Sequence, residues 1–393
     1  MKISYVIAAH NRREPLLRTL RILHDTTPIP RNQWEAWVVD NGSTDGTLDA
    51  VRREFPEARI IARPSNEGGW SRGYAFEPAK GEFVILLDDD GHPIDDAVPK
   101  SIAYLEANAA CAAMVGLVVL PDGTHEACAL PSVILSGAVC IRRSVLLELG
   151  GFRPEFFSKA RDFDLSYRIW DAGYSIERCE EIIYRRDKVA SGRRAGLAHR
   201  MDLRDNLILI ERYLPSRLRP EYRRDAIQRC TALARHDGYA AYAYLARCEG
   251  MIRRLRESLR GRTTLASELI QTIHQLDPQA KRIARWAKQN AVKSVVVADL
   301  SENLFATYGG CRRSGLRVSA IADNHPAFAG LIYRDIPVLS DALALASKPD
   351  GIVISNINPA QVDGVAARFI ESFKGPTLRL WHPAEKTELR QAA

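Results

Sequence analysis

FVILLDDD, residues 83–90, is the most informative segment of this chain for its fold. An unbroken apolar run of this length is typical of a strand that is buried on both faces of a sheet. Three aspartates follow it directly. Hard divalent cations take oxygen ligands, and Mg²⁺ usually binds between one or two carboxylates and the phosphates of a substrate. The stretch therefore predicts a buried strand that ends at a cation site for a phosphate-bearing ligand.

Strand-like and helix-like segments alternate on both sides of this run. Helical patterns lie at residues 14–24 and 48–55. Further apolar runs predict strands at residues 3–9, 36–39, 60–61, 113–120 and 136–142. Such an alternation is typical of an α/β fold. We therefore expect one sheet-based domain over residues 1–215.

The rest of the chain predicts two further parts. Apolar residues recur at helical spacing and strand signals disappear, which predicts a helical segment over residues 216–290. Apolar runs then return, and we expect a small Rossmann-like α/β domain over residues 291–393. Its strands are expected at residues 294–299, 316–322 and 351–355. The first turn of this domain, residues 300–303, lacks the glycines that let a pyrophosphate approach the start of the helix. We therefore favour a domain that has lost dinucleotide binding and serves assembly or acceptor placement over one that binds a dinucleotide.

The composition limits the kinds of partner. The chain has 393 residues and a net charge of +7, which suits anionic ligands such as nucleotide diphosphates or an acidic lipid surface. Its seven cysteines are scattered without a C-x-x-C pair, so neither a disulfide framework nor a zinc site is expected. We find no signal peptide and no apolar run of transmembrane length. We therefore expect a cytoplasmic protein with no nucleic-acid partner.

An arginine-rich stretch, residues 253–262, bears on membrane contact. Such a run usually forms a solvated helix face, and only sometimes contacts a membrane or an acidic acceptor. The sequence thus leaves open a peripheral contact at the inner face of the cell membrane. It also leaves open a homo-oligomer.

Polar clusters follow three of the predicted strands. They are AHNR (9–12), DNGSTDG (40–46) and DDD (88–90). Ligands of open α/β sheets bind beyond the carboxyl ends of the strands. A turn or a helix cap would also explain the cluster at Asp40, whereas three adjacent carboxylates repel one another unless a positive group joins them. The glycine-rich loop NEGGWSRGY (66–74) permits close approach of a ligand to the backbone and is not a Walker motif.

The order and spacing of these motifs resemble family 2 glycosyltransferases with a GT-A fold. The resemblance covers about residues 2–215 and is carried by VVDNGSTDGT, NEGGWSRGY, LLDDD, SGAVCIRRSVLLELGGF and ARDFDLSYRIWDAGY. It implies a D-x-D element in which Asp90 and Asp88 bind a divalent cation, Mn²⁺ or Mg²⁺. It also implies that Ala9 and Asp40 contact the nucleotide base and that the 66–74 loop lines the diphosphate sugar. The implied donor-binding residues are Ala9, Asn11, Asp40, Asn66, Gly69, Arg72, Asp88 and Asp89.

The resemblance also implies a catalytic base. The family commonly reads Glu-Asp-x-Asp-Leu where this chain reads RDFDL (161–165). Asp162 is therefore the expected base, which takes the proton of an acceptor hydroxyl in a single displacement with inversion. Asp164 would help to start the helix that follows. Arg161 departs from the family pattern, and a cation beside Asp162 is expected to make it a weaker base.

A second departure concerns the cation. The family often has a metal-contacting histidine after a strand, where this chain reads IYRRD (183–187). His92 or His199 could substitute for it, or an arginine could contact the phosphates directly. A lone histidine is more often structural than a ligand, so we assign neither.

These features lead to one expected function and two alternatives. We expect an inverting glycosyltransferase, similar to rhamnosyl- and galactofuranosyltransferases. It would move a sugar from a UDP- or dTDP-linked donor to a glycan or lipid-linked acceptor in cell-surface polysaccharide biosynthesis. One alternative is a nucleotidyltransferase or sugar-nucleotide pyrophosphorylase, although AAHN (8–11) stands where its triphosphate loop would be. The other is a non-catalytic sugar-nucleotide-binding scaffold.

Overall fold

The computed structural model describes residues 1–157, 159–189, 195–259 and 264–381. The chain divides into two compact units. The first comprises residues 1–127 and 132–192, and the second comprises residues 128–131 and 193–393. Arg260 and Arg262 of the arginine-rich stretch lie outside the described residues.

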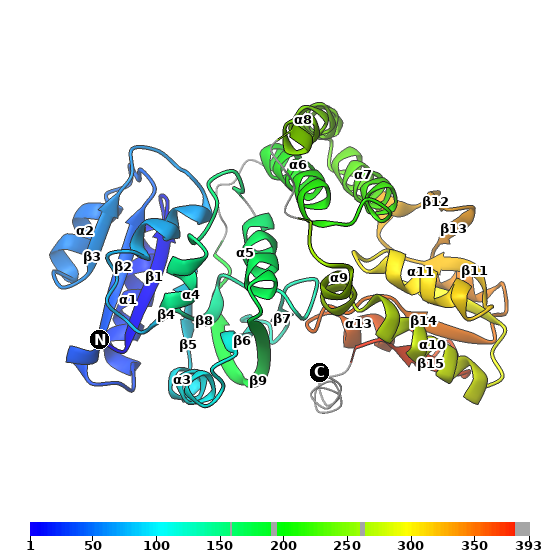
Figure 1. The fold of residues 1–393 in the computed structure, drawn as a ribbon, viewed down its shortest axis with the longest axis horizontal. Coiled ribbons are helices and arrows are strands. Elements are labelled where there is room, and N and C mark those ends of the chain that lie inside the picture. The colour runs from blue at the N-terminus through cyan, green and yellow to red at the C-terminus, as the bar shows by residue number, and fades with distance from the viewer. Residues whose placement is uncertain (158, 190–194, 260–263, 382–393) are drawn as a thin grey trace. The chain divides into compact units, whose positions relative to one another are not determined.

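The first unit is built on a nine-stranded mixed sheet (Figure 1). The strand order is β3-β2-β1-β4-β8-β6-β9-β5, and β7 pairs with β6. The strands are β1 (Ile3–Ala9), β2 (Trp34–Asp40), β3 (Arg59–Ala62), β4 (Phe83–Leu87), β5 (Gly91–Pro93), β6 (Cys111–Val119), β7 (His125–Glu126), β8 (Ala138–Arg142) and β9 (Ser175–Arg186). The helices are α1 (Arg13–Thr26), α2 (Thr47–Glu54), α3 (Ala97–Ala107), α4 (Arg143–Glu148) and α5 (Ala160–Asp171), with 3-10 turns η1 (Arg31–Gln33) and η2 (Gly69–Ala75). The predicted α/β fold class is confirmed.

Two hydrophobic cores cover the two faces of this sheet, because successive side chains of a strand point to opposite faces. From β4, Phe83, Ile85 and Leu87 enter one core together with apolar residues of α1 and α2. Val84 and Leu86 enter the other core together with residues of α4 and α5. All five β4 side chains are fully buried. This double burial explains why the strand reads as a continuous apolar run.

The carboxyl ends of the central strands meet at one edge of the sheet. Strands β2, β1 and β4 are parallel, and Ala9 lies opposite Asp40. Strand β8 runs antiparallel to β4 and pairs Ala138 with Leu87, so the residues that precede β8 lie at the same edge. Strand β9 is parallel to β6, which is antiparallel to β8. The carboxyl end of β9, at Arg186, therefore also lies at this edge.

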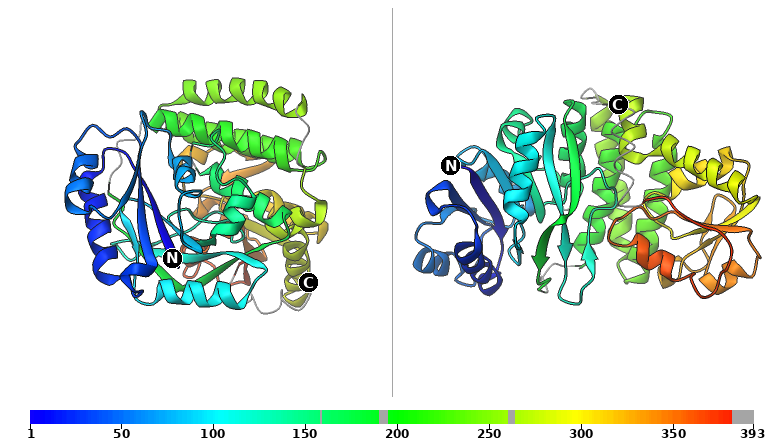
Figure 2. Two further views of the ribbon diagram at one scale, coloured as in Figure 1. Left: turned by 60° about the vertical axis from the view of Figure 1, so that its left-hand side comes forward. Right: turned by 90° about the horizontal axis from the view of Figure 1, so that it is seen from below.

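The second unit contains a helical part and a second sheet. Its helices are α6 (Ala195–Tyr213), α7 (Arg219–His236), α8 (Ala240–Leu259), α9 (Ser267–His274) and α10 (Leu276–Gln289). Helices α6 and α8 lie side by side in the left view of Figure 2, and each also packs on α7. Because α6 belongs to this helical part, the compact units separate near residue 192, earlier than the boundary expected at residue 215.

The second sheet has six strands in the order β12-β13-β11-β10-β14-β15, and all neighbours except β12 and β13 are parallel. This is a Rossmann-like arrangement. Its elements are β10 (Ser294–Ala298), α11 (Leu304–Arg313), β11 (Arg317–Ala322), η3 (Pro326–Phe328), β12 (Ile332–Tyr333), β13 (Ile336–Leu339), α12 (Asp341–Leu345), β14 (Gly351–Ile354), α13 (Val362–Ala367) and β15 (Thr377–Arg379). Within the described ranges, no helix combines the length and apolarity needed to cross a bilayer.

Internal contacts occupy the strand ends of this second sheet. Asp323, after β11, accepts a hydrogen bond from the backbone N–H of Leu300 at 2.9 Å. Asp299, after β10, accepts one from Asn356 at 2.5 Å. Burial, together with the neighbouring Asp323 carboxyl, raises the pKa of Asp299 to about 6. These side chains occupy the turn in which a dinucleotide-binding domain has glycines.

Candidate functional site

The triple aspartate lies directly after β4, at the edge where the central strands end. Three arginines from separate parts of the first unit contact it, namely Arg12 after β1, Arg72 in η2 and Arg186 at the end of β9. We call these six residues the aspartate–arginine cluster. The sheet brings them together, because they are up to 174 positions apart in the sequence.

Asp90 is the most enclosed of the three aspartates. Its side chain is 1% exposed and contacts two arginines. Arg12 Nη2 lies 2.7 Å from Asp90 Oδ2, and Arg186 Nε lies 3.0 Å from Asp90 Oδ1. The backbone N–H of Val189 also donates to Asp90 Oδ2 at 3.0 Å. Both carboxylate oxygens of the expected metal ligand are therefore hydrogen-bonded within the protein.

Asp88 lies between two further guanidinium contacts. Arg72 Nη2 is 2.6 Å from Asp88 Oδ1, and Arg186 Nη1 is 3.1 Å from Asp88 Oδ2. Burial by itself would raise the pKa of Asp88, but the charges of Arg186, Arg72 and Arg161 outweigh it and hold that pKa well below its usual value. Arg72 is 3% exposed and also donates to the carbonyl oxygen of Leu87. The arginine thereby anchors the end of β4.

Asp89 has a different environment from its two neighbours. Among the described residues its guanidinium partner is Arg12, whose Nη2 lies 3.0 Å from Asp89 Oδ1. Burial and the nearby charges of Asp88 and Asp90 outweigh Arg12 and raise the pKa of Asp89 to about 6. Like charges held this close disfavour one another, so the arginines are needed to keep three carboxylates together.

The donor set of this cluster suits a divalent cation in its chemistry. Asp88 and Asp90 offer carboxylate oxygens, which hard cations prefer. Both carboxylates already share one positive group, the guanidinium of Arg186, which also lies 2.9 Å from Glu126 Oε2. The guanidinium of Arg186 thus lies between the two carboxylates, where a divalent cation would bind. Among the residues that the structure describes, no group of three histidine, cysteine, aspartate or glutamate side chains is arranged to hold a metal ion.

Neither candidate histidine contacts the aspartates in the described part of the chain. His92 is buried on β5, opposite Arg185 of β9, and burial lowers its pKa. His199 belongs to the second unit, where its Nε2 lies 2.9 Å from Asp237 Oδ2. In the segment 183–187, where the family resemblance implies a histidine, Arg186 contacts Asp88 and Asp90.

Asp162 is buried in the first turn of α5, where Ser136 binds its carboxylate. The backbone N–H of Ser136 donates to Asp162 Oδ2 at 3.2 Å, and the hydroxyl of Ser136 donates to Oδ1. Arg161 Nε lies 3.4 Å from Asp162 Oδ1. The carboxylate is therefore held in a fixed orientation.

Two adjacent residues connect Asp162 with the aspartate–arginine cluster. Ser136 binds Asp162, and the next residue, Gly137, faces Asp88. A Cβ atom added at Gly137 would lie 2.8 Å from Asp88 Oδ2, so only glycine leaves room for that carboxylate. The expected base and the expected D-x-D element thus lie on either side of one dipeptide.

Asp164 has a structural environment. Its side chain is fully buried and accepts hydrogen bonds from Arg168 Nε at 3.0 Å and Nη2 at 2.7 Å. Arg153 Nη1 lies 3.5 Å from its other oxygen. The Asp164–Arg168 pair lies within α5, and Arg168 also donates to the carbonyl oxygens of Leu149 and Gly151, which joins α5 to the segment before it.

Asp40 and Asn11 lie together after β2 and β1. Asn11 adopts a left-handed conformation with φ of 52°, which asparagine tolerates, and its Oδ1 accepts from the Thr44 N–H at 2.7 Å. Asp40 Oδ2 accepts from the Ser43 N–H at 3.2 Å. The buried Asp40 Oδ1 and Asn41 Oδ1 accept no hydrogen bond from the described residues. Buried acceptors are normally satisfied, so these two oxygens mark a place for a donor group.

The 66–74 loop packs against the segment that carries Arg161. Asn66 Oδ1 accepts from the Gly68 N–H at 2.9 Å and shapes the turn. A Cβ atom added at Gly69 would lie 2.4 Å from the Arg161 guanidinium carbon, so this glycine makes room for that arginine. The first unit therefore has space for Arg161, the residue that departs from the family pattern.

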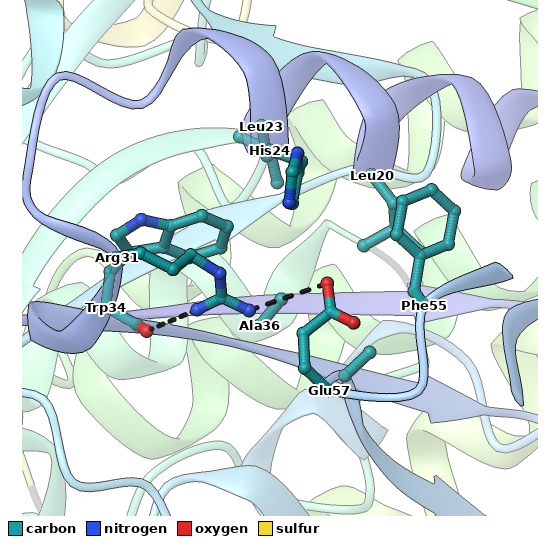
Figure 3. Close-up of a pocket in the computed structure, with 9 residues that line it drawn as sticks. Leu20, Leu23, His24, Arg31, Trp34, Ala36, Phe55 and Glu57 are labelled. Carbon is teal, nitrogen blue, oxygen red and sulfur yellow. Dashed lines mark hydrogen bonds and ion pairs between the residues drawn. The ribbon is translucent and has the colours of Figure 1, made fainter.

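A separate hollow lies in the first unit, away from the strand ends. Leu20, Leu23 and His24 of α1 face Trp34 and Ala36 of β2, and an Arg31–Glu57 ion pair crosses its mouth (Figure 3). Its volume of about 10 Å³ is room for about one water molecule. It is too small to be a substrate site.

Four residues of the site were not predicted from the sequence. These are Arg12, Ser136, Gly137 and Arg186. Arg12 and the Ser136-Gly137 pair lie inside motifs that the sequence analysis quotes, and Arg186 was noted as a family departure. Their roles depend on contacts between distant strands, which no local pattern reveals.

Comparison with known proteins finds glycosyltransferases. Residues 4–127 match the model of "Glycosyl transferase family 2", in agreement with the resemblance seen in the sequence. Glycosyltransferase AglE of Haloferax volcanii is 23% identical over 46% of this chain and 65% of its own length. Poly(ribitol-phosphate) beta-glucosyltransferase of Bacillus spizizenii is 33% identical over 28% of this chain and 18% of its own length.

Solved structures with a similar fold include two glycosyltransferases. Staphylococcus aureus TarS residues 1–349 with UDP-GlcNAc has a TM-score of 0.49 and 17% identity, over 80% of this chain and 93% of that one. The mannosyltransferase PcManGT of Pyrobaculum calidifontis, solved with GDP-Man and Mn²⁺, has a TM-score of 0.44 and 17% identity, over 79% of this chain and 84% of that one.

Proposed function

We propose that this protein is an inverting glycosyltransferase that moves a sugar from a nucleoside diphosphate to an acceptor hydroxyl. One observation carries the proposal. Ser136 binds Asp162 while its neighbour Gly137 faces Asp88, so a base and a diphosphate-binding cluster flank one dipeptide. Both lie at the strand ends of a domain that carries the family 2 match.

The donor is proposed to bind along this edge, with its base at Ala9, Asn11 and Asp40. Uracil and thymine each present one imide N–H, which matches the unsatisfied Asp40 Oδ1. We therefore propose a UDP- or dTDP-linked sugar. The diphosphate would lie against the turn formed by Asn66 and Gly69 and the nearby guanidinium groups, because paired N–H donors of arginine suit phosphate oxygens.

Asp88 and Asp90 are the residues that would hold a divalent cation, Mn²⁺ or Mg²⁺. When bound, such a cation stabilises negative charge on the departing diphosphate. Arg72 donates to both Asp88 and the Leu87 carbonyl at the end of β4. Arg12, in the loop after β1, donates to Asp89 and Asp90. These contacts keep the carboxylates at the edge of the sheet.

Asp162 is proposed to take the proton from the acceptor hydroxyl. A base must be within hydrogen-bond reach of that proton, and its orientation has to be maintained. Ser136 supplies this orientation through its N–H and hydroxyl, and the first turn of α5 positions the backbone. The hydroxyl oxygen then attacks the anomeric carbon, and the nucleoside diphosphate leaves from the opposite face.

The acceptor is proposed to be a glycan or a lipid-linked glycan of the cell surface. Of the two relatives, AglE is named only as a glycosyltransferase, and the name of the poly(ribitol-phosphate) beta-glucosyltransferase agrees with a polymeric acceptor. The chain spans 65% of the first relative's length and 18% of the second's. The proposed acceptor therefore follows from the expected chemistry of a glycosyltransferase and is not taken from either relative. We further propose that the reaction takes place at the inner face of the cell membrane.

Replacing Asp162 with Asn tests this function. Donor binding, measured as thermal stabilisation by a panel of UDP-, dTDP- and GDP-sugars with and without Mn²⁺, should persist. Transfer to cell-surface glycan, measured as release of the nucleoside diphosphate, should fall by roughly 10²- to 10⁴-fold, the usual contribution of a general base. Asp171→Asn, at the exposed end of the same helix, is the matched control and should keep its activity. Full activity of Asp162→Asn, or no stabilisation by any donor, would refute the proposal.

A further inference from the structure

Arg186 occupies the position between the two carboxylates that are proposed to hold a cation. Its Nη1 lies 3.1 Å from Asp88 Oδ2, and its Nε lies 3.0 Å from Asp90 Oδ1. One guanidinium thus bridges the first and third aspartates of the triplet. A divalent cation bound by the same oxygens would lie within a few ångströms of this positive group.

We infer that Arg186 is a displaceable counter-ion of the cation site. In the free protein it binds Asp88 and Asp90 and opposes cation binding. The donor diphosphate attracts its guanidinium, and the carboxylates then accept the cation, so that cation and nucleotide bind cooperatively. The inference rests on the proposed function, and it assigns Arg186 a role that opposes the cation until the nucleotide arrives.

The charges of the cluster support this coupling. Four carboxylates, those of Asp88, Asp89, Asp90 and Glu126, face the three guanidinium groups of Arg12, Arg72 and Arg186. A divalent cation added alone would leave a net positive charge in a largely buried place, which is costly. A nucleoside diphosphate sugar brings two negative charges and restores the original balance. The cation and the diphosphate should therefore each favour binding of the other.

The burial of the three arginines indicates which of them moves. Arg72 is enclosed and bonded to the Leu87 carbonyl, and the side chain of Arg12 is 10% exposed. The side chain of Arg186 is 28% exposed, the largest value of the three. It can turn from the carboxylates to a phosphate without opening the core. A guanidinium binds phosphate with paired N–H donors, so the exchange preserves its hydrogen bonding.

Binding of Mn²⁺ to the full-length protein, measured by electron paramagnetic resonance and calorimetry, tests this inference. For the wild type, Mn²⁺ should bind at least about tenfold more tightly with UDP or dTDP present than without, a coupling of about 1.4 kcal/mol. Arg186→Gln should bind Mn²⁺ without nucleotide at least about tenfold more tightly than the wild type. The effect of the nucleotide on Mn²⁺ affinity should shrink correspondingly in this variant.

Two further variants separate charge from packing. Arg186→Lys keeps the positive charge, so its affinity for Mn²⁺ alone should stay as low as that of the wild type. Arg185→Gln removes a more exposed neighbouring charge that lies 4.0 Å from Asp187, and it should leave both affinities unchanged. Thermal unfolding of each variant checks that the fold is retained.

The inference is wrong if the wild type and Arg186→Gln bind Mn²⁺ alone equally, or if neither binds it. It is also wrong if Arg186→Lys behaves like Arg186→Gln, because charge would then not be the cause. Failure of the proposed function has a different signature, in which no nucleotide sugar binds any variant. In that case, the affinities of the wild type and Arg186→Gln for Mn²⁺ alone still decide whether Arg186 opposes cation binding.

Discussion

Asp88, Asp89 and Asp90 are neighbours in the sequence, yet different partners bind their carboxylates. Arg72 and Arg186 lower the pKa of Asp88 against the effect of burial, whereas burial and like charges raise that of Asp89 to about 6. Three adjacent like charges are tolerated here because each has a guanidinium partner within about 3 Å. The arginines are therefore as much a part of the site as the aspartates.

Gly137→Ala should weaken donor binding. The added Cβ would lie 2.8 Å from Asp88 Oδ2, so the carboxylate has to shift away from Arg186 and Arg72. We expect a loss of roughly tenfold in affinity for UDP- or dTDP-sugar, about 1.4 kcal/mol, measured by calorimetry. Gly309→Ala is the control, because a Cβ there meets nothing within 4 Å on helix α11. Equal affinities in both variants would contradict this role of Gly137.

At the scale of single elements, helix α5 carries two aspartates in different environments. Its first turn carries Asp162, and the next turn buries Asp164 against Arg168. The two aspartates are two residues apart and therefore point in different directions on a helix. The sequence predicts that Asp164 helps to start the helix, but α5 begins at Ala160 and Asp164 instead pairs with Arg168 within the helix.

Asp164→Ala should destabilise the first unit without removing a group of the proposed site. The change leaves Arg168 buried and without its closest carboxylate, which costs about 3 kcal/mol of unfolding free energy. Asp49→Ala breaks an exposed ion pair with Arg52 on α2 and should cost less than about 0.5 kcal/mol. Urea unfolding of both variants measures the difference. Similar losses in the two would show that burial does not set the strength of the Asp164 pair.

Strands made of a long apolar run could be predicted from the sequence. Strands in which charged or half-buried residues interrupt the apolar positions could not. The predicted run 83–87 is identical to β4, Phe83–Leu87, because burial on both faces leaves an unmistakable pattern. Strand β9, Ser175–Arg186, was not predicted, because charged and half-buried residues interrupt its apolar positions. The short strands β5 and β7 were missed as well. Their formation depends on the neighbouring strand that each one pairs with.

At the scale of the whole molecule, the chain joins a mixed-sheet unit to a unit with helices and a Rossmann-like sheet. The second unit carries buried titratable groups of its own. Burial lowers the pKa of His274 to about 4, and Tyr222 Oη lies 3.3 Å from its Nδ1. Burial also raises the pKa of Asp225 to about 7, partly offset by Arg334. The stability of this unit is therefore expected to depend on pH near neutrality.

His274 should make the second unit less stable in mild acid. Its pKa is lower in the folded than in the unfolded state, so the unfolded state takes up a proton first as the pH falls below about 6.5. The free energy of unfolding should fall by about 2 kcal/mol between pH 6.5 and pH 4.5 from this residue alone. Urea titrations of the wild type and His274→Leu at several pH values measure this. The difference between them should change in that window and stay constant above pH 7, and a constant difference throughout would contradict the prediction.

The sequence by itself determined the α/β class, the buried strand at residues 83–87 and the family resemblance, because these follow from local hydrophobic patterns and from motif order. It also identified Asp162 and the three aspartates as candidates. Only the tertiary structure decided that Arg12, Arg72 and Arg186 bind those aspartates and that Ser136 and Gly137 link them to Asp162. The reason is physical. Charge pairing and close packing at a sheet edge depend on strand order and register, which bring together residues that are far apart in the chain.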